Sequence, residues 1–231
     1  YNVVGVITSP DKPAGRGYKI QQSPVKKYAL RHDLFVLQPE KLKNEVFLNE
    51  LRKLKADLQI VVAFRMLPEV VWSMPSKGTF NLHASLLPQY RGAAPINWAI
   101  INGEKETGVT TFFLSNEIDT GKIIFQKKVA IEKNDNAETL HNKLMREGAG
   151  LVIKTVDAIL NDTVEAVSQN EYITNQIELK PAPKIYRETC KINWDQPAEN
   201  IYNFIRGLSP YPAAWTELEI DTENTLNLKL F

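Results

Sequence analysis

The sequence is poor in cysteine, histidine and long apolar runs. Cys190 is the only cysteine among 231 residues, which excludes a disulfide within the chain and a zinc or iron–sulfur site built from several cysteines. The three histidines, His32, His83 and His141, are far apart and lack the spacing of metal ligands. No stretch approaches about 18 uninterrupted apolar residues, so no helix is expected to span a membrane. These absences favour a cytoplasmic protein without a metal.

Charge gives a divided signal about nucleic acid. The net charge of the whole chain is only +1, which does not predict an RNA-binding protein. Between positions 11 and 31, however, the basic residues outnumber the single acid, Asp11; they are Lys12, Arg16, Lys19, Lys26, Lys27 and Arg31. Phosphate contacts need only a local patch of this kind, although a solvated loop and helix face is the simpler interpretation of the charges alone.

Strand-like and helix-like patterns alternate in the first part of the chain. Buried strands are expected at Val3–Thr8, Leu34–Leu37 and Leu58–Phe64, with helices between them, the first capped by Ser23 and opened by Pro24. This alternation is typical of an α/β protein with an open, doubly wound and mainly parallel sheet.

Later segments extend this pattern and then change it. Helices are expected near 94–102 and over 135–160, the longer one opened by a capping box from Asp135 to Glu138, and strands are expected at 109–114 and 123–129. Two prolines make Lys180–Lys184 a stiff, extended linker. A helix over 198–206 and strands near 214–220 and 226–230 then suggest a second, smaller domain.

An amide, an imidazole and a carboxylate follow one another in a short piece of chain. Asn81 and His83 are two positions apart on a β-prone segment, so they project from the same face, and Pro88 then breaks the strand. An amide donor beside a histidine suits a carbonyl carbon that becomes tetrahedral and negatively charged. Asp119 lies in a later turn, where it could fix the tautomer of His83 and support its charged form, although it could also simply cap that turn.

Several motifs resemble the formyltransferases that use 10-formyltetrahydrofolate. They are Asn81-x-His83, Ser85-Leu-Leu-Pro88, Tyr90–Pro95, Glu106–Thr110 and Asp119-Thr-Gly121. Two further segments are similar to the branch of the superfamily that formylates the amino group of initiator methionyl-tRNA. Ser9–Lys19 resembles its basic tRNA-binding loop, and Arg206–Thr216 resembles its C-terminal domain. The resemblance covers nearly the whole chain.

This resemblance implies an architecture. Residues 1–179 would form a Rossmann-like formyltransferase domain, 180–184 the linker, and 185–231 a small OB-like β-barrel. The family has a strand and a helix before the position of Tyr1, and its second domain continues beyond the position of Phe231, so truncation at both ends is expected. A monomer is expected.

The resemblance also implies a reaction and its residues. A formyl group would pass from 10-formyltetrahydrofolate to the α-amine of initiator methionyl-tRNA, with Asn81 and His83 stabilising the oxyanion and Asp119 orienting His83. The family's folate contacts fall on Phe64, Arg65, Met66, Leu67, Ser85, Leu86, Leu87, Pro88 and Ile118, and its tRNA contacts fall on Lys12, Arg16 and Lys19. Gly92 is expected to matter for backbone geometry, and Arg91 is a candidate ligand.

Three alternatives stay open. Sugar-nucleotide N-formyltransferases and formyltetrahydrofolate hydrolases carry versions of the same motifs, and the basic loop and the second domain separate this chain from them. A noncatalytic RNA-binding module is a different class of protein, and the Asn81, His83 and Asp119 set weighs against it.

Overall fold

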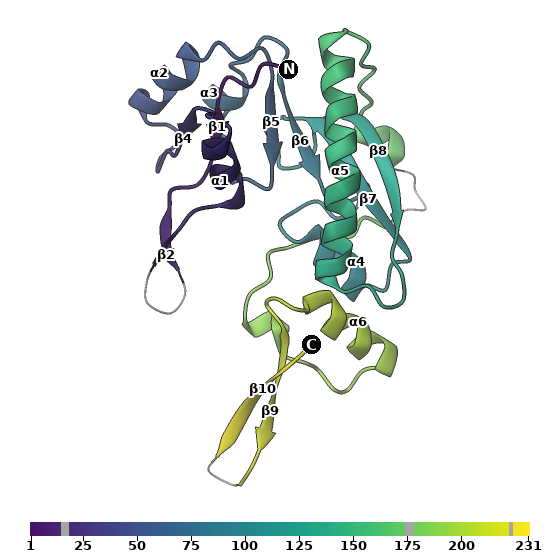
Figure 1. Ribbon diagram of the computed structural model, residues 1–231. Helices are drawn as coiled ribbons and strands as arrows, with labels where there is room; N and C mark the ends of the chain where they lie inside the picture. The colour runs from purple at the N-terminus through teal and green to yellow at the C-terminus, as the bar shows by residue number, and fades with distance from the viewer. Residues whose placement is uncertain (15–18, 174–177, 222–223) are drawn as a thin grey trace. The chain divides into compact units, whose positions relative to one another are not determined.

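The computed structural model describes residues 1–14, 19–173, 178–221 and 224–231. This part of the chain forms two compact units, which are drawn together in Figure 1. The first unit contains residues 1–60 and 64–79, and the second contains residues 61–63 and 80–231. Each unit has its own hydrophobic core.

The first unit contains the parallel strand pair predicted from the sequence. Strand β1 (Val6–Ile7) pairs in parallel with β4 (Val36–Leu37), and a short antiparallel pair, β2 (Lys12–Ala14) and β3 (Lys19–Gln21), precedes the first helix. The helices of this unit are α1 (Pro24–Arg31), α2 (Glu45–Lys53) and α3 (Glu69–Trp72). The Ser23 hydroxyl accepts a hydrogen bond from the Lys26 N–H at 3.1 Å, which confirms the predicted cap of α1.

The second unit is built on a sheet in the order β5 (Gln59–Val62), β6 (Thr79–His83), β7 (Glu106–Phe113), β8 (Ile123–Ala130), of which β5 is shared with the first unit. Strands β6, β7 and β8 run antiparallel, whereas the sequence predicted a mainly parallel sheet. The reason for the β7–β8 pair is its short connection over residues 114–122, because a parallel crossover needs roughly a dozen residues or more.

Helix α5 (Ala137–Leu160) packs against β7 and β8. The Thr155 hydroxyl lies 2.9 Å from that of Thr111 on β7, and both side chains are buried. The cap of α5 is one residue later than predicted. Asn136 and Thr139 form the capping box, whereas Asp135 instead accepts the Glu132 N–H at 2.7 Å.

The C-terminal part of the second unit packs against the rest of that unit through a contact between two helices. Helix α6 (Ala198–Leu208) lies against α4 (Pro95–Ile101), and the Asn97 amide donates to the Gly207 carbonyl at 2.7 Å. Strands β9 (Ala214–Glu219) and β10 (Thr225–Leu230) form a separate antiparallel pair. The predicted OB-like barrel is not confirmed, since the described residues beyond 184 contain this two-stranded ribbon and no closed barrel. Nowhere in the described ranges is a helix long and apolar enough to cross a membrane.

Candidate active site

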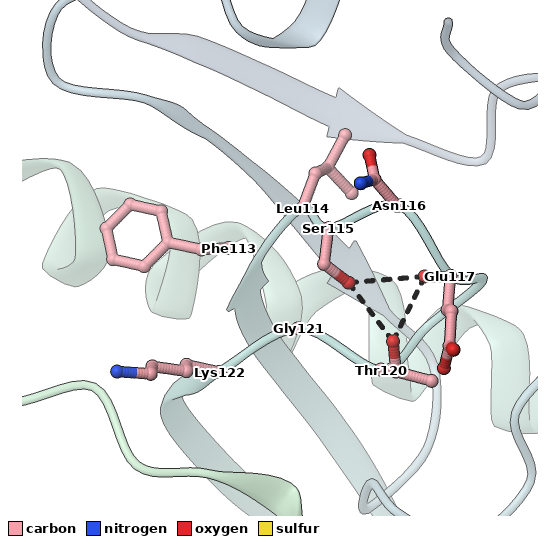
Figure 2. A pocket seen from close by; sticks show the side chains of 8 residues that line it. All are labelled: Phe113, Leu114, Ser115, Asn116, Glu117, Thr120, Gly121 and Lys122. Carbon is pink, nitrogen blue, oxygen red and sulfur yellow. Dashed lines mark hydrogen bonds between the residues drawn. The ribbon is translucent and has the colours of Figure 1, made fainter. Parts of the chain in front are cut away.

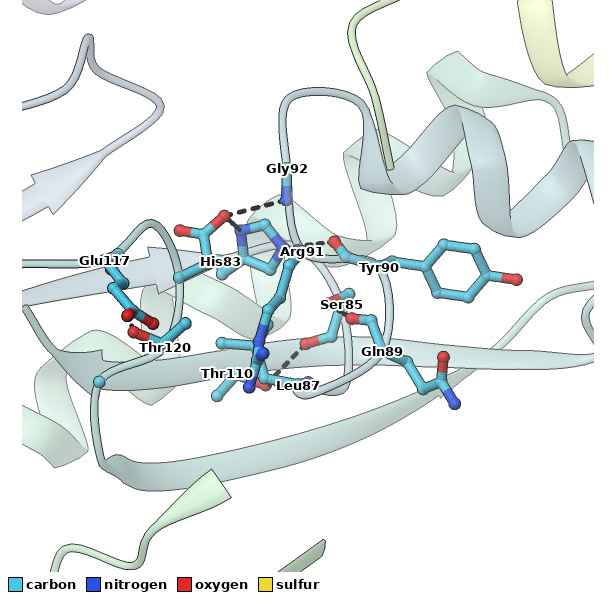
Figure 3. Close-up of polar contacts among 12 residues, drawn as sticks. His83, Ser85, Leu87, Gln89, Tyr90, Arg91, Gly92, Thr110, Glu117 and Thr120 are labelled. Atoms are coloured by element: carbon cyan, nitrogen blue, oxygen red, sulfur yellow. Dashed lines mark hydrogen bonds and ion pairs between the residues drawn. The ribbon is translucent and has the colours of Figure 1, made fainter. Parts of the chain in front are cut away.

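His83 ends strand β6 and is almost completely buried, with 6% of its surface exposed. Its Nε2 atom lies 2.9 Å from the carbonyl oxygen of Tyr90, and Figure 3 shows the ring beside the backbone of the Tyr90–Gly92 loop. A carbonyl oxygen only accepts hydrogen bonds, so we assign the proton of the ring to Nε2. The Tyr90 carbonyl therefore fixes the tautomer of His83. The sequence had suggested Asp119 for this role.

The other ring nitrogen of His83 faces a carboxylate. Nδ1 lies 3.8 Å from Oδ2 of Asp119, whose side chain is 13% exposed. In the neutral ring this nitrogen would present a lone pair to the negative charge, whereas in the imidazolium it carries a second N–H. The carboxylate of Asp119 therefore faces the nitrogen that would carry this second N–H.

Backbone geometry holds Asp119 in place. The residue adopts a left-handed conformation, with φ of 55°, in the turn between β7 and β8. Its Oδ2 atom also accepts the Gly92 N–H at 3.0 Å. Gly92 has φ of 127°, and a Cβ atom there would lie 2.4 Å from the carbonyl oxygen of Ala182. Only glycine fits this position without strain, as the sequence had indicated.

Asn81 lies two residues before His83 on β6, so both residues project from the same face of the strand. Its Oδ1 atom is buried and has no hydrogen-bond partner among the described residues. A buried polar atom without a partner costs about 1–3 kcal/mol, so this oxygen is suited to a donor on a ligand.

The segment around Ala182 is hydrogen-bonded to the loop at residues 90–92, which contacts His83 and Asp119. Tyr90 N–H donates to the Lys180 carbonyl at 2.7 Å, and Ala182 N–H donates to the Arg91 carbonyl at 2.9 Å. Side chains also join the two segments, because both the Tyr90 hydroxyl and the Lys180 ammonium donate to Glu104 Oε1, at 2.6 and 2.7 Å. Burial opposes the charge on Glu104, but these two bonds outweigh it and hold the pKa of Glu104 below its usual range. Burial, followed by the bond to Glu104, raises the pKa of Tyr90.

The expected folate residues of the second unit differ in exposure. Ser85, Leu87 and Pro88 are buried, and the Ser85 hydroxyl donates to the Gln89 carbonyl at 2.6 Å, so it is occupied within its own loop. Leu86 is partly buried, whereas Ile118, in the turn before Asp119, is 63% exposed.

The expected folate residues of the first unit follow strand β5. Phe64 and Leu67 pack against the core of that unit, and Met66 is 75% exposed. The Arg65 guanidinium donates to the backbone carbonyls of Pro39 and Glu40, the latter at 2.7 Å. Its charge is therefore directed at its own unit's backbone.

The basic segment is only partly described. Lys12 is exposed on β2, the backbone of Lys19 begins β3, and Arg16 lies outside the described residues. Lys26 forms an ion pair with Asp11 at 2.6 Å, so its charge is largely compensated within the segment. Hydrogen bonds from Lys26 and Gln38 hold the pKa of Asp11 below its usual range.

A shallow pocket of about 530 Å³ lies at the turn between β7 and β8. Figure 2 shows its polar lining, in which the hydroxyls of Ser115 and Thr120 are 3.1 Å apart and both donate to the Glu117 carbonyl. The lining includes neither Asn81, His83 nor Asp119. The candidate active site is therefore identified by these three side chains and not by this pocket. Across the described ranges, no group of three histidine, cysteine or acidic side chains is arranged to hold a metal ion.

Comparison with known proteins decides the family. The formyl transferase family matches residues 1–169, and the family of formyl transferase C-terminal domains matches residues 184–231. The methionyl-tRNA formyltransferase of Bacteroides thetaiotaomicron is 66% identical over 231 residues, which are all of this chain and 71% of that protein. The chain belongs to the methionyl-tRNA formyltransferase family. It is a formyl-transferring enzyme, and the sequence-based prediction of the family is confirmed.

Solved structures agree on the fold. A 4-N formyltransferase from Francisella tularensis superposes with a TM-score of 0.68 at 22% identity, covering 89% of this chain and 82% of that one. HypX from Aquifex aeolicus, solved with tetrahydrofolic acid, gives a TM-score of 0.64 at 19% identity over 83% of this chain and 32% of that one. These likenesses support the formyltransferase fold with its Rossmann-like sheet.

The sequence alone missed one residue beside the cluster. Gln169 is 2% exposed, and its amide donates to the carbonyls of Asp119 and Gly121. It belongs to none of the motifs and is separated from Asp119 by a strand and the long helix α5, so no local pattern could have identified it.

Proposed function

We propose that the chain transfers the formyl group of 10-formyltetrahydrofolate to the α-amine of initiator methionyl-tRNA in the cytoplasm, acting as a monomer. The observation that carries this proposal is the cluster of Asn81, His83 and Asp119 in a member of this family. Folate as the donor is further supported by the tetrahydrofolic acid in the HypX structure.

In the proposed reaction, the neutral amine attacks the formyl carbon and a new carbon–nitrogen bond forms. The carbonyl oxygen of the formyl group becomes an oxyanion, which the Asn81 amide and the charged His83 stabilise. The bond from the formyl carbon to N10 of the folate then breaks, N10 takes up a proton, and the amine nitrogen loses one. Tetrahydrofolate leaves, and no covalent intermediate with the protein is needed.

The geometry suits each assigned role. The unpartnered Oδ1 of Asn81 can accept an N–H of the attacking amine while the amide nitrogen of the same side chain donates to the oxyanion. His83 is held by Tyr90 and faced by Asp119, so its charge can develop without reorganisation of the ring.

Substrate contacts are proposed from the family resemblance. For the folate they are Phe64–Leu67, Ser85–Pro88 and Ile118, with backbone groups contributing where the side chains are buried. For the tRNA they are Lys12, Arg16 and Lys19, which would bind phosphates of the acceptor arm. The two-domain division at 180–184 is part of the same proposal.

The experiment that tests this function compares acceptors. Purified protein is given 10-formyltetrahydrofolate and either charged initiator tRNA or an amino-sugar nucleotide, and kcat/KM is measured for each, with donor and no acceptor as the hydrolase control. We expect transfer to the tRNA to dominate. Preferred formylation of the sugar, or equal release of formate without acceptor, would favour the alternatives.

A further inference from the structure

Gln169 is brought to the active site by a pairing that the family motifs do not include. Val167 forms an antiparallel bridge with Ile123 at the start of β8, with backbone hydrogen bonds of 2.8 and 2.9 Å. The chain then enters the short helix η1 (Gln169–Tyr172), whose first residue faces the turn that carries Asp119. A segment far along the chain therefore packs beside the catalytic turn.

Every hydrogen-bonding group of the Gln169 side chain is used. Its Nε2 atom donates to the carbonyl oxygens of Asp119, at 2.8 Å, and Gly121, at 2.9 Å. Its Oε1 atom accepts two bonds from Arg91, one from Nε at 3.0 Å and one from a terminal nitrogen at 2.6 Å. A primary amide offers two donors and two acceptor positions, so this side chain is saturated.

These bonds join two segments that both contact the active-site histidine. The turn at Asp119 supplies the carboxylate opposite Nδ1 of His83, and the loop at Arg91 lies between the Tyr90 carbonyl and the Gly92 N–H. Asp119 also has the left-handed backbone conformation, which a side chain disfavours and which surrounding contacts must maintain.

We propose that Gln169 is a positioning residue for formyl transfer, which holds the backbone of Asp119 and the Arg91 loop so that the carboxylate meets His83. The inference rests on the proposed function, because it requires Asp119 to act in that reaction. Gln169 does not itself touch His83 in the structure, and it acts through the two segments that it joins.

Two substitutions separate the parts of this role. Gln169→Met has a similar size and removes all four bonds. Gln169→Glu keeps an acceptor for Arg91 but loses both donors, and it places a carboxylate against the carbonyls of Asp119 and Gly121. If positioning of the Asp119 turn matters, both variants lose activity, whereas a role limited to Arg91 predicts that Gln169→Glu stays active.

A matched control corrects for general destabilisation. Thr155→Val also removes buried hydrogen bonds, the one with Thr111 and the one to the Leu151 carbonyl, and nearly preserves the side-chain volume. Thermal unfolding of all four proteins is measured with single-turnover rates and with folate binding by fluorescence titration. We expect the single-turnover rate to fall by about tenfold to a hundredfold in both Gln169 variants, because small misplacements are costly in catalysis. The folate dissociation constant and the rate of Thr155→Val should both stay within about twofold of the parent.

Several results would overturn the proposal. They are a Gln169→Met enzyme with a parental single-turnover rate, an active Gln169→Glu enzyme, or a Thr155→Val enzyme that loses as much rate as the Gln169 variants. Because the parent is assayed alongside, these results leave transfer to methionyl-tRNA intact. A parent that does not formylate the tRNA would refute the proposed function and this inference with it.

Discussion

Replacing Asp119 by asparagine removes one charge from the proposed active site while leaving its shape nearly unchanged. The carboxylate oxygen is 3.8 Å from Nδ1 of His83, and asparagine can still accept the Gly92 N–H through its own oxygen. At that separation, two unit charges attract by roughly 4 kcal/mol with an effective dielectric constant of about 20. Each 1.36 kcal/mol corresponds to a tenfold rate change, so the loss in the single-turnover rate has an upper limit of about a thousandfold.

We expect Asp119→Asn to lower the single-turnover rate by about a hundredfold to a thousandfold, with folate affinity within about threefold of the parent. Asp119→Ala is the companion variant, because it also deprives Gly92 of its acceptor and should be slower than Asp119→Asn. The assay follows a single turnover by rapid quench, with enzyme in excess over charged tRNA. An Asp119→Asn enzyme within about threefold of the parental rate would refute the electrostatic reasoning.

Three further predictions concern Gly92, the buried carboxylate of Asp135 and the basic segment. Gly92→Ala should destabilise the protein by about 1–3 kcal/mol and slow the reaction. The Cβ atom of the alanine would lie 2.4 Å from the Ala182 carbonyl oxygen, and the backbone at this position has φ of 127°. A parental free energy of unfolding in urea would contradict this prediction. Burial opposes the charge of Asp135, but hydrogen bonds from Lys143, Glu132 and Thr139 outweigh burial and lower the pKa of this carboxyl. The ionised carboxylate therefore stabilises the folded protein at neutral pH, and this stabilisation is lost as the pH falls through the pKa of Asp135 in the folded state. Asp135→Asn should thus be less stable than the parent at pH 7, with the gap closing below about pH 4 in urea titrations, and a gap that is constant with pH would exclude this cause. Arg16→Ala should raise KM for tRNA and reduce the slope of log KM against log salt by about 1, with folate affinity unchanged; equal slopes would remove Arg16 from recognition.

Local chemistry made most of the elements predictable. The Ser23 cap, the long apolar stripe of α5 and the strands β7 and β8 appear within a few residues of their expected positions. The pairing of Asn81 with His83 on one strand face also follows from the period of two in a β-strand. These features depend on neighbours in the sequence, so the sequence alone could specify them.

Features that depend on distant contacts were not predictable. The antiparallel pairing of β6 with β7 depends on which edges meet, and the alternating patterns do not encode it, whereas the short connection between β7 and β8 could have predicted the direction of that pair. The tautomer of His83 depends on the Tyr90 carbonyl, a backbone group that every residue carries. Gln169 reaches the Asp119 turn through the Val167–Ile123 bridge, for which the sequence gives no local signal.

The measurement that tests the central claim most directly is the mass of the amino acid released from the tRNA. Charged initiator tRNA is incubated with 10-formyltetrahydrofolate and either the parent or His83→Ala, and the ester is hydrolysed before mass spectrometry. We predict formylmethionine from the parent and almost only methionine from His83→Ala, although the variant still binds folate. Unmodified methionine from the parent, or equal formylmethionine from both proteins, would contradict formyl transfer by this site.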